Sequence, residues 1–364
     1  MISKSSRRDT IIVNCQLSIV NSAKPDKFPI YLLPRYTGSL NRGYKKRGIP
    51  MDYFFAPMEG LTDAVYRHLH HKYFPGVTGY YIPFFSPTQH RSLTPREARE
   101  LPPAEKEDFL AVPQVMTKNT EDFLWAAQVC ADLGYREINL NLGCPSGTVV
   151  SKGKGSGMLA DPDGLDFFLD TVCARSPIPI SVKTRLGLEQ PEEFYGLLEI
   201  FNRYPLRLLI LHPRVRKDFY DRPLREDWFS YAVEHSVNPV CRSGGIFARA
   251  QADSFGAAFS INSVMIGRGL IGDPGMLTPG GTTAAALEAF FGELLEAYLT
   301  DFGGSRNAMF RLKEHWRYLL RRFSGSDKLG KQLRKTTDLA QYKAITREIF
   351  HTLPLRKELD PDWV

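Results

Sequence analysis

The chain has 364 residues, of which 43% are hydrophobic and 24% charged, a composition typical of globular proteins that excludes a largely disordered or collagen-like chain. The net charge of +7 belongs to the first 50 residues: these contain ten Lys/Arg and two Asp/Glu, which leaves 37 basic and 38 acidic residues in the other 314. The overall basicity is therefore no evidence for a nucleic-acid partner, which requires a local basic patch.

Residues 1–50 have neither a sustained hydrophobic period nor the compact apolar region of a signal peptide. Their Ser, Asn, Pro and Lys/Arg content is typical of disorder. The hydrophobic patterning typical of a folded protein starts at Met51. We therefore expect residues 1–50 to be a disordered, dispensable leader or a mis-assigned start.

From Met51 onward, short apolar runs alternate with segments of helical spacing. Examples of the helical faces are Phe123 with Ala126 and Leu165 with Phe168. The expected strands are 53–56, 78–82, 110–115, 137–141, 178–183, 207–212, 239–242 and 263–267. Eight strands alternating with helices predict a (β/α)8 TIM barrel, with a doubly wound sheet as the alternative.

After Pro274 the pattern changes. A Pro/Gly-rich turn precedes Thr283, a plausible helix cap, and then an apolar stripe that includes Leu287 and Phe290. Two more helical stretches follow, at 308–323 and 337–351. We expect a catalytic barrel over residues 51–277 and a small helical domain over 278–364.

The ends of the predicted strands carry chemically capable side chains. "CRSGG" and "IGRG" follow strands seven and eight, and Ser243, Gly244, Gly245, Gly267 and Arg268 there predict the phosphate site common in barrels. Tight turns without a ligand are the alternative.

Charged and amide side chains end other strands. Lys183 and Arg185 share parity on strand five, so both can point into the barrel mouth, where two cations require an anion or an electron-rich ring. His212 and Arg214 form a similar pair after strand six, and Gln114 ends strand three. An amide such as Gln114 can read the edge of a heterocycle with donor and acceptor together.

Cys144 follows strand four in "INLNLGCPSG". Five widely scattered cysteines without a CxxC pair argue against a zinc site or a disulfide framework and suit a reducing cytoplasm, so no metal is expected. Taken alone, a cysteine of this kind is more often a plain buried thiol than a reactive group.

In this order and spacing, "APMEGLTD", "INLNLGCPSG", "SVKTRLG", "LHPR" and "VMIGRG" resemble the tRNA-dihydrouridine synthases over roughly residues 51–350. The resemblance implies an FMN-dependent barrel with a C-terminal helical RNA-binding domain. It implies that reduced FMN gives a hydride to C6 of a uracil, that Cys144 donates a proton to C5, and that NADPH or NADH reduces the flavin again. A thiol suits the proton donor because it is mostly protonated near neutral pH.

The resemblance also assigns the remaining site residues. The flavin would contact Pro57, Met58, Glu59, Gln114, Lys183 and His212, and its phosphate would lie on Ser243, Gly244, Gly245, Gly267 and Arg268. The tRNA side would be formed by Asn141, Arg185, Arg214, Arg317, Arg321 and Arg322, the last three from the segment 311–335, which carries nine Lys/Arg and two Asp/Glu. These cations would contact phosphates largely without reading bases. The alternative is that these cations form only a solvent-exposed helix face that binds no RNA.

The chain departs from the family at three places. "SGG" at 243–245 replaces the usual Asn-Gly-acid loop, Pro83 stands about where strand two usually ends in an acid, and Gly147 replaces a usual lysine.

We expect a cytoplasmic enzyme that acts on tRNA as a monomer, with no membrane or obligate protein partner. Two alternatives remain: another FMN barrel acting on a free pyrimidine or an enoate, and a non-catalytic RNA-binding barrel.

Overall fold

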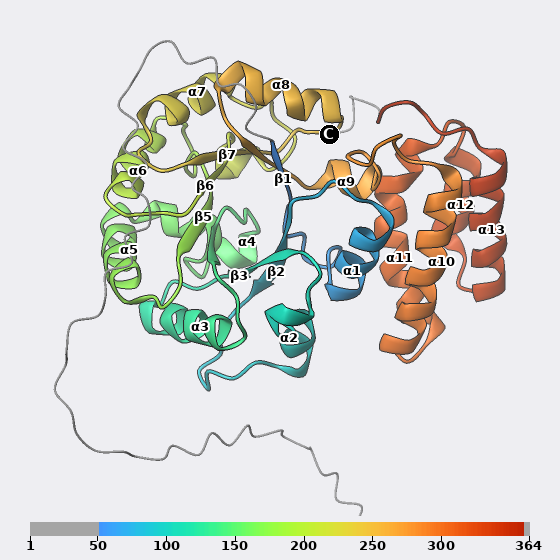
Figure 1. The fold of residues 1–364 in the computed structure, drawn as a ribbon, viewed down its shortest axis with the longest axis horizontal. Helices are drawn as coiled ribbons and strands as arrows, with labels where there is room; N and C mark the ends of the chain where they lie inside the picture. Colours follow the sequence, from blue (N-terminus) through green and yellow to red (C-terminus); the bar gives the residue numbers. More distant parts are fainter. Residues whose placement is uncertain (1–50, 360–364) are drawn as a thin grey trace, which may run out of the picture. The chain divides into compact units, whose positions relative to one another are not determined.

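The computed structural model describes residues 51–359, which form a closed parallel barrel followed by a group of helices (Figure 1). The strands pair in chain order, and β8 pairs with β1 to close the ring. They are β1 (Asp52–Phe55), β2 (Gly79–Phe85), β3 (Leu110–Val115), β4 (Ile138–Leu142), β5 (Ile180–Arg185), β6 (Leu209–His212), β7 (Val240–Ser243) and β8 (Ser263–Ile266). The predicted TIM barrel is confirmed, and closure rules out the doubly wound sheet. The predicted leader, residues 1–50, lies outside the described residues.

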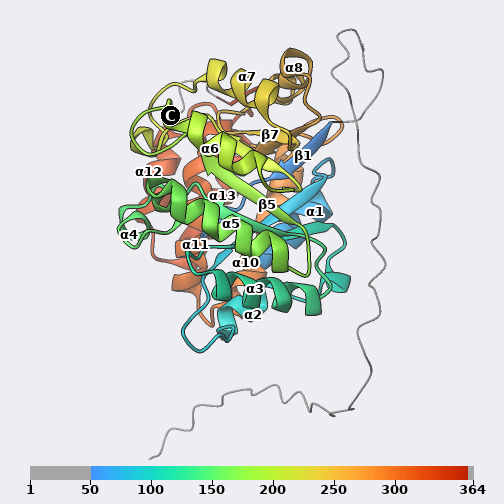
Figure 2. The same cartoon turned by 90° about the vertical axis from the view of Figure 1, so that its left-hand side faces the viewer.

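Helices cover the outside of the barrel, as Figure 2 shows for α5 and α6 in front of β5. The helices up to the end of the barrel are α1 (Ala64–Tyr73), α2 (Pro95–Glu100), α3 (Thr120–Asp132), α4 (Gly147–Val150), α5 (Pro162–Arg175), α6 (Glu193–Asn202), α7 (Glu226–His235), α8 (Arg249–Phe259) and α9 (Arg268–Gly272). Of these, α4 is a single turn in the loop after Cys144. Side chains of Asn119 and Asp161 cap α3 and α5 by accepting hydrogen bonds from backbone N–H groups of the first turn. The predicted apolar faces of both helices are buried.

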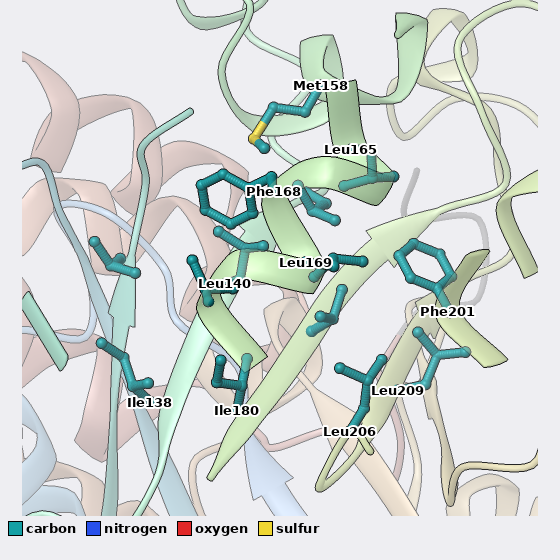
Figure 3. Packing of buried hydrophobic residues seen from close by; sticks show 14 of the residues in the cluster. Ile138, Leu140, Met158, Leu165, Phe168, Leu169, Ile180, Phe201, Leu206 and Leu209 are labelled. Carbon is teal, nitrogen blue, oxygen red and sulfur yellow. The ribbon is translucent and has the colours of Figure 1, made fainter. Parts of the chain in front are cut away.

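The period of two in β4 decides which side chains reach the barrel mouth. Ile138 and Leu140 point outward and join the cluster that contains Phe168 and Leu169 of α5 (Figure 3). The alternate residues, Asn139 and Asn141, are therefore on the inner side. The outward residues hold the helices, and the inward ones are available for polar contacts between strands.

Four further helices follow the barrel and pack beside α1 and α9 (Figure 1). They are α10 (Ala284–Asp301), α11 (Ser305–Leu319), α12 (Asp327–Lys335) and α13 (Leu339–Thr352). The predicted cap at Thr283 is confirmed, because its hydroxyl accepts a hydrogen bond from the N–H of Ala286 at 3.1 Å. The predicted stretches 308–323 and 337–351 correspond to α11 and α13. Sequence reasoning treated 311–335 as a basic run and did not separate α12 as a helix.

The C-terminal helices share one continuous apolar cluster with the barrel side that carries α1. Polar contacts add to it: the Tyr298 hydroxyl donates to the Asp63 carboxylate at 2.9 Å, and His315 Nε2 lies 2.7 Å from the Leu61 carbonyl. Residues 51–359 therefore form one compact unit. The expected domain boundary at 277/278 stays a prediction. No helix between residues 51 and 359 is long and apolar enough to cross a membrane.

Candidate active site

Two adjoining cavities contain most of the predicted site residues. The first, about 390 Å³, is lined by Pro57, Met58, Lys183, Arg185, His212, Ser243, Gly244, Gly245, Gly267, Arg268 and Arg317. The second, about 300 Å³, is lined by Pro57, Met58, Glu59, Gln114, Asn141, Cys144 and Lys183. Lys183 lines both, so it stands at their junction. The cavities have the size range of small-molecule sites.

The glycine loop after β7 is shaped by a buried arginine. Arg242 donates hydrogen bonds to the carbonyls of Ser243 at 2.7 Å and Gly244 at 2.8 Å, and its guanidinium pairs with the Glu226 carboxylate. With these carbonyls turned toward Arg242, the N–H groups of the same trans peptides point the opposite way. Gly244 has φ +92°, and a Cβ there would lie 2.6 Å from His212 Nε2. Glycine is required because both the backbone conformation and the space exclude a side chain.

The Lys183 side chain is half-buried between the two cavities, and its ammonium makes no hydrogen bond or ion pair with any other described residue (51–359). Burial, reinforced by the neighbouring Arg185 guanidinium, lowers the pKa of Lys183 to about 8. A half-buried ammonium without an anionic partner is costly for the protein alone. Such a group is suited to holding negative charge on a ligand.

His212 and Arg214 form a hydrogen-bonded pair after β6. Arg214 Nη1 donates to His212 Nε2 at 3.1 Å, and burial together with the cations Arg185, Lys183 and Arg214 lowers the pKa of His212 well below its ordinary value. His212 is therefore neutral at physiological pH and accepts this hydrogen bond. Arg214 lines neither cavity; its Nε donates to the Arg222 carbonyl at 2.5 Å, which ties the loop after β6 to the strand end.

Arg185 points to the barrel mouth, as its parity with Lys183 predicted. Its guanidinium, however, forms hydrogen bonds with backbone carbonyls of the protein. Its guanidinium donates to the carbonyls of Gly143 at 2.9 Å, Val215 at 3.1 Å and Phe219 at 2.8 Å. It also lies over the Tyr220 ring, 5.2 Å from the centroid. Arg185 thus joins the loops after β4, β5 and β6 around the cavities.

A line of amides connects β5, β4 and β3 to the backbone of Cys144. Asn139 Nδ2 donates to Ser181 Oγ at 2.8 Å, and Gln114 Nε2 donates to Asn139 Oδ1 at 2.7 Å. Asn141 Nδ2 donates to Gln114 Oε1 at 2.8 Å, and Asn141 Oδ1 accepts from the N–H groups of Gly143 and Cys144. The backbone groups are donors only, so they fix the orientation of every amide in the line.

Cys144 is half-buried and lines the second cavity. Its carbonyl accepts hydrogen bonds from the Ser156 hydroxyl at 2.8 Å and the Ser156 N–H at 3.2 Å. The segment that begins at Gly155 is buried against it, whereas Lys152 is exposed. The loop after Cys144 therefore contributes a packed floor as well as an exposed basic tip.

Other predicted residues lie farther from the junction of the cavities. Glu59 is at the rim and pairs with Arg96, with Oε1 and Nη2 2.6 Å apart. Arg317 reaches the first cavity from α11 and is exposed, whereas Arg322 is buried and pairs with Asp273. Neither Arg321 nor Arg322 lines either cavity.

Sequence reasoning missed two tyrosines that line both cavities, Tyr220 from the loop after β6 and Tyr318 from α11. Tyr220 lies within 5.2 Å of both the Arg185 and the Arg268 guanidinium. An aromatic residue that closely follows the His-Pro-Arg strand end was the available signal. Tyr318 was obscured because it stands in a run dominated by charge.

Comparison with known proteins assigns a family to this arrangement. The family model described as dihydrouridine synthase matches residues 54–350, which include the barrel and nearly all of the C-terminal helices. A probable tRNA-dihydrouridine synthase 1 of Synechocystis is 26% identical over 321 residues, covering 82% of this chain and 86% of that protein. The tRNA-dihydrouridine(16) synthase of Neisseria meningitidis is 25% identical over 315 residues, covering 80% and 93%. A probable tRNA-dihydrouridine synthase of Staphylococcus aureus is 26% identical over 317 residues, covering 82% and 94%.

Proposed function

The chain belongs to the dihydrouridine synthase family, and from this we propose that it reduces the C5=C6 bond of specific uridines in tRNA to 5,6-dihydrouridine, using FMN and NADPH or NADH. The observation that supports this best is the position of Lys183 between a glycine- and cation-lined cavity and a second cavity that contains Cys144. One cavity suits a bound anion, and the other offers a thiol to a second molecule.

The first cavity fits the phosphate of FMN. Its end is formed by the Gly244 and Gly245 turn and by Gly267 before α9, where backbone N–H groups favour an anion. Arg268 adds a guanidinium at the same end. The departure at "SGG" removes side-chain acceptors and donors but retains these backbone groups. Arg242, which holds the carbonyls away, compensates for the missing side chains.

The ring of the flavin would lie where the two cavities meet. When bound, FMN supplies the hydride chemistry of the reaction. Lys183 would hold negative charge on the ring, and binding an anion there would raise the pKa of Lys183 back toward its ordinary value. Gln114, whose orientation is fixed by Asn139 and Asn141, would present a defined donor and acceptor to the heterocycle.

Cys144 would deliver the proton to C5 of the uracil. Its backbone is held on both sides, by Asn141 at its N–H and by Ser156 at its carbonyl, so the thiol is directed into the second cavity. Preorganisation of this kind is what general acid catalysis requires. Asn141, which the sequence assigned to the uracil, therefore also positions the proton donor.

A uracil inside folded tRNA must leave its stack to reach Cys144. Exposed cations on α11 and α12 would hold the RNA while it does so, and Arg317 links them to the first cavity. An enzyme for free pyrimidines or enoates does not need these helices, and a non-catalytic binding barrel does not need the cavities. We propose that the protein acts as a monomer in the cytoplasm.

Dihydrouridine formation by the purified protein tests the proposal. The protein is incubated with FMN, NADPH and tRNA that lacks dihydrouridine, and the nucleosides are then mapped by position-resolved mass spectrometry. We expect a gain of 2 Da at one or a few uridines, in agreement with the added hydride and proton. Unchanged tRNA together with a protein that cannot be loaded with FMN would refute the proposed function.

A further inference from the structure

An exposed phenylalanine stands between two cavities on the outer face of the C-terminal helices. Phe310 of α11 has 70% of its side chain exposed. On one side is a cavity of about 770 Å³ between α11 and α12, and on the other is one of about 480 Å³; Phe310 and Lys313 line both. Packing of the protein does not explain this residue, because α11 buries Met309, Leu312 and Trp316 instead.

The surroundings of Phe310 are basic. Spacings of three or four residues place it on one face of α11 with exposed or half-buried cations on both sides. The cations of this face and of the adjoining cavities are Arg306, Lys313, Arg317, Arg321, Arg334 and Arg356, against two acids, Glu314 and Asp327, in the larger cavity. This charge is complementary to a polyanion.

The backbone of Arg334 is held close to the turn of α11 that carries Phe310. Lys313 Nζ donates hydrogen bonds to the carbonyls of Arg334 at 3.3 Å and of Thr336, the last turn and the cap of α12. This contact ties the end of α12 to the turn of α11 that follows Phe310. The backbone that carries Arg334 is thus held next to the turn that carries Phe310.

One residue, Arg317, stands between the larger cavity and the active site. Arg317 lines both that cavity and the glycine- and cation-lined cavity of the barrel. It lies seven residues from Phe310, about 10 Å along the helix axis. A chain of phosphates that follows this face would lead directly to the site where the base is reduced.

We propose that Phe310 stacks on an unpaired base of the tRNA near the target uridine, while the cations beside it hold the flanking phosphates. Single-stranded nucleic acid is commonly bound by such a combination of an aromatic platform and a basic groove, whereas a paired stem does not expose base faces. The inference rests on the proposed function, since it names how the tRNA substrate of that site is gripped.

Binding of unmodified tRNA, measured by fluorescence anisotropy at several salt concentrations, tests the proposal. Phe310→Ala is expected to weaken binding about tenfold and to leave the salt dependence unchanged, because stacking is lost but no charge is removed. Phe310→Trp is expected to bind like the parent chain, with tryptophan fluorescence quenched by tRNA but not by a fully paired RNA duplex. Arg334→Ala is expected to reduce the salt slope by about one.

Phe167→Ala is the matched control, because Phe167 is 69% exposed on α5 beside Asp166 and Asp170, an acidic setting. Equal tRNA affinity of Phe310→Ala and the parent chain would overturn the proposal and assign the ring to another partner, such as a protein. Equally weak binding by Phe310→Ala and Phe310→Trp would also overturn it. Dihydrouridine formation at saturating tRNA is measured in parallel, so that failure of the proposed reaction is distinguished from failure of the stacking contact.

Discussion

The side-chain oxygen of Asn141 accepts a hydrogen bond from the backbone N–H of Cys144 at 3.0 Å, while the Asn141 amide nitrogen donates to Gln114 at 2.8 Å. One inward-facing side chain of β4 thus joins the residue proposed to donate the proton to the residue proposed to contact the flavin. The two halves of the site are set relative to each other by this single amide.

Asn141→Asp tests that link. The aspartate retains acceptors for the Cys144 backbone but places an oxygen against Gln114 Oε1, so the line of amides to Asn139 is broken at a buried position. We expect dihydrouridine formation to fall at least tenfold and the flavin spectrum to shift. Asn202→Asp, at a half-buried helix end outside the cavities, is the control. Parent-like activity and spectrum would contradict the link.

Cys144→Ala separates flavin chemistry from proton delivery. We expect the variant to retain FMN and its reduction by NADPH, and to form product about 100-fold more slowly or not at all, the range typical for loss of a general acid. Flavin reduction is followed by absorbance and product by nucleoside mass spectrometry. Cys173→Ala, at a half-buried thiol of α5, should behave as the parent chain. A fully active Cys144→Ala would exclude the proton-donor role.

Lys183→Met is expected to stabilise the flavin-free protein while abolishing flavin binding. The pKa of Lys183 is about 8 in the folded chain and near 10.4 when unfolded, so below pH 8 the folded state bears the cost of a charged, half-buried lysine. Between pH 8 and about 10.4 the unfolded state binds the extra proton, so the parent chain gains stability as pH rises. The advantage of the variant in Tm should therefore be largest near pH 7 and shrink toward pH 10. A pH-independent difference would show that Lys183 is not strained. Lys217→Met, at an exposed lysine, is measured as the control.

Gly244→Ala tests the phosphate loop. Both φ +92° and the 2.6 Å approach of a Cβ to His212 Nε2 oppose a side chain, and we expect a loss of about 1–3 kcal/mol together with release of flavin on gel filtration. Gly292→Ala is the control, since nothing lies within 4 Å of the added Cβ on α10. Its helix should be unchanged or slightly stabilised. Retention of flavin by Gly244→Ala would mean that the loop is not the phosphate site.

Substitutions of the neighbouring residues Arg321 and Arg322, just after α11, are expected to differ in their effects on stability and on tRNA binding. Arg322 is buried and pairs with Asp273 at 3.3 Å, so Arg322→Ala should lower stability by about 3 kcal/mol. Arg321 is exposed and lines the basic cavity, so Arg321→Ala should lower Tm less than Arg322→Ala and reduce the salt dependence of tRNA binding. Thermal unfolding and binding titrations distinguish the two. Identical effects would show that the two side chains share one role.

Arg321 and Arg322 also show which features of the fold and site can be predicted from the sequence and which cannot. Alternation and glycine placement predict the strands and the two loops after β7 and β8, because these depend on local spacing. The parity of Lys183 and Arg185 predicts correctly that both reach the first cavity. Adjacent arginines in a basic run carry no such signal: the phase of the turn after α11, which directs Arg322 toward Asp273, is set by distant packing.

Hydrogen-bond partners that come from distant loops could not be predicted either, because they also depend on distant packing. The carbonyls that occupy Arg185 come from Gly143, Val215 and Phe219, and only closure of the barrel brings them together. Likewise, three strands must align before Asn139, Gln114 and Asn141 can form one line. Sequence identified which side chains gather at the mouth, but not which of them bind one another.

The contacts of the C-terminal helices with Leu61 and Asp63 have a consequence for protein engineering. These residues follow directly on Met58 and Glu59, which line the cavities, and they are bound by His315 and Tyr298 of the helices. The helices proposed to hold the RNA are therefore not an interchangeable module. A chimaera that exchanges the helices of two relatives must exchange the loop from Met58 to Asp63 with them. A mismatched pair would distort the wall proposed to face the flavin before any change in the modified uridine could be observed.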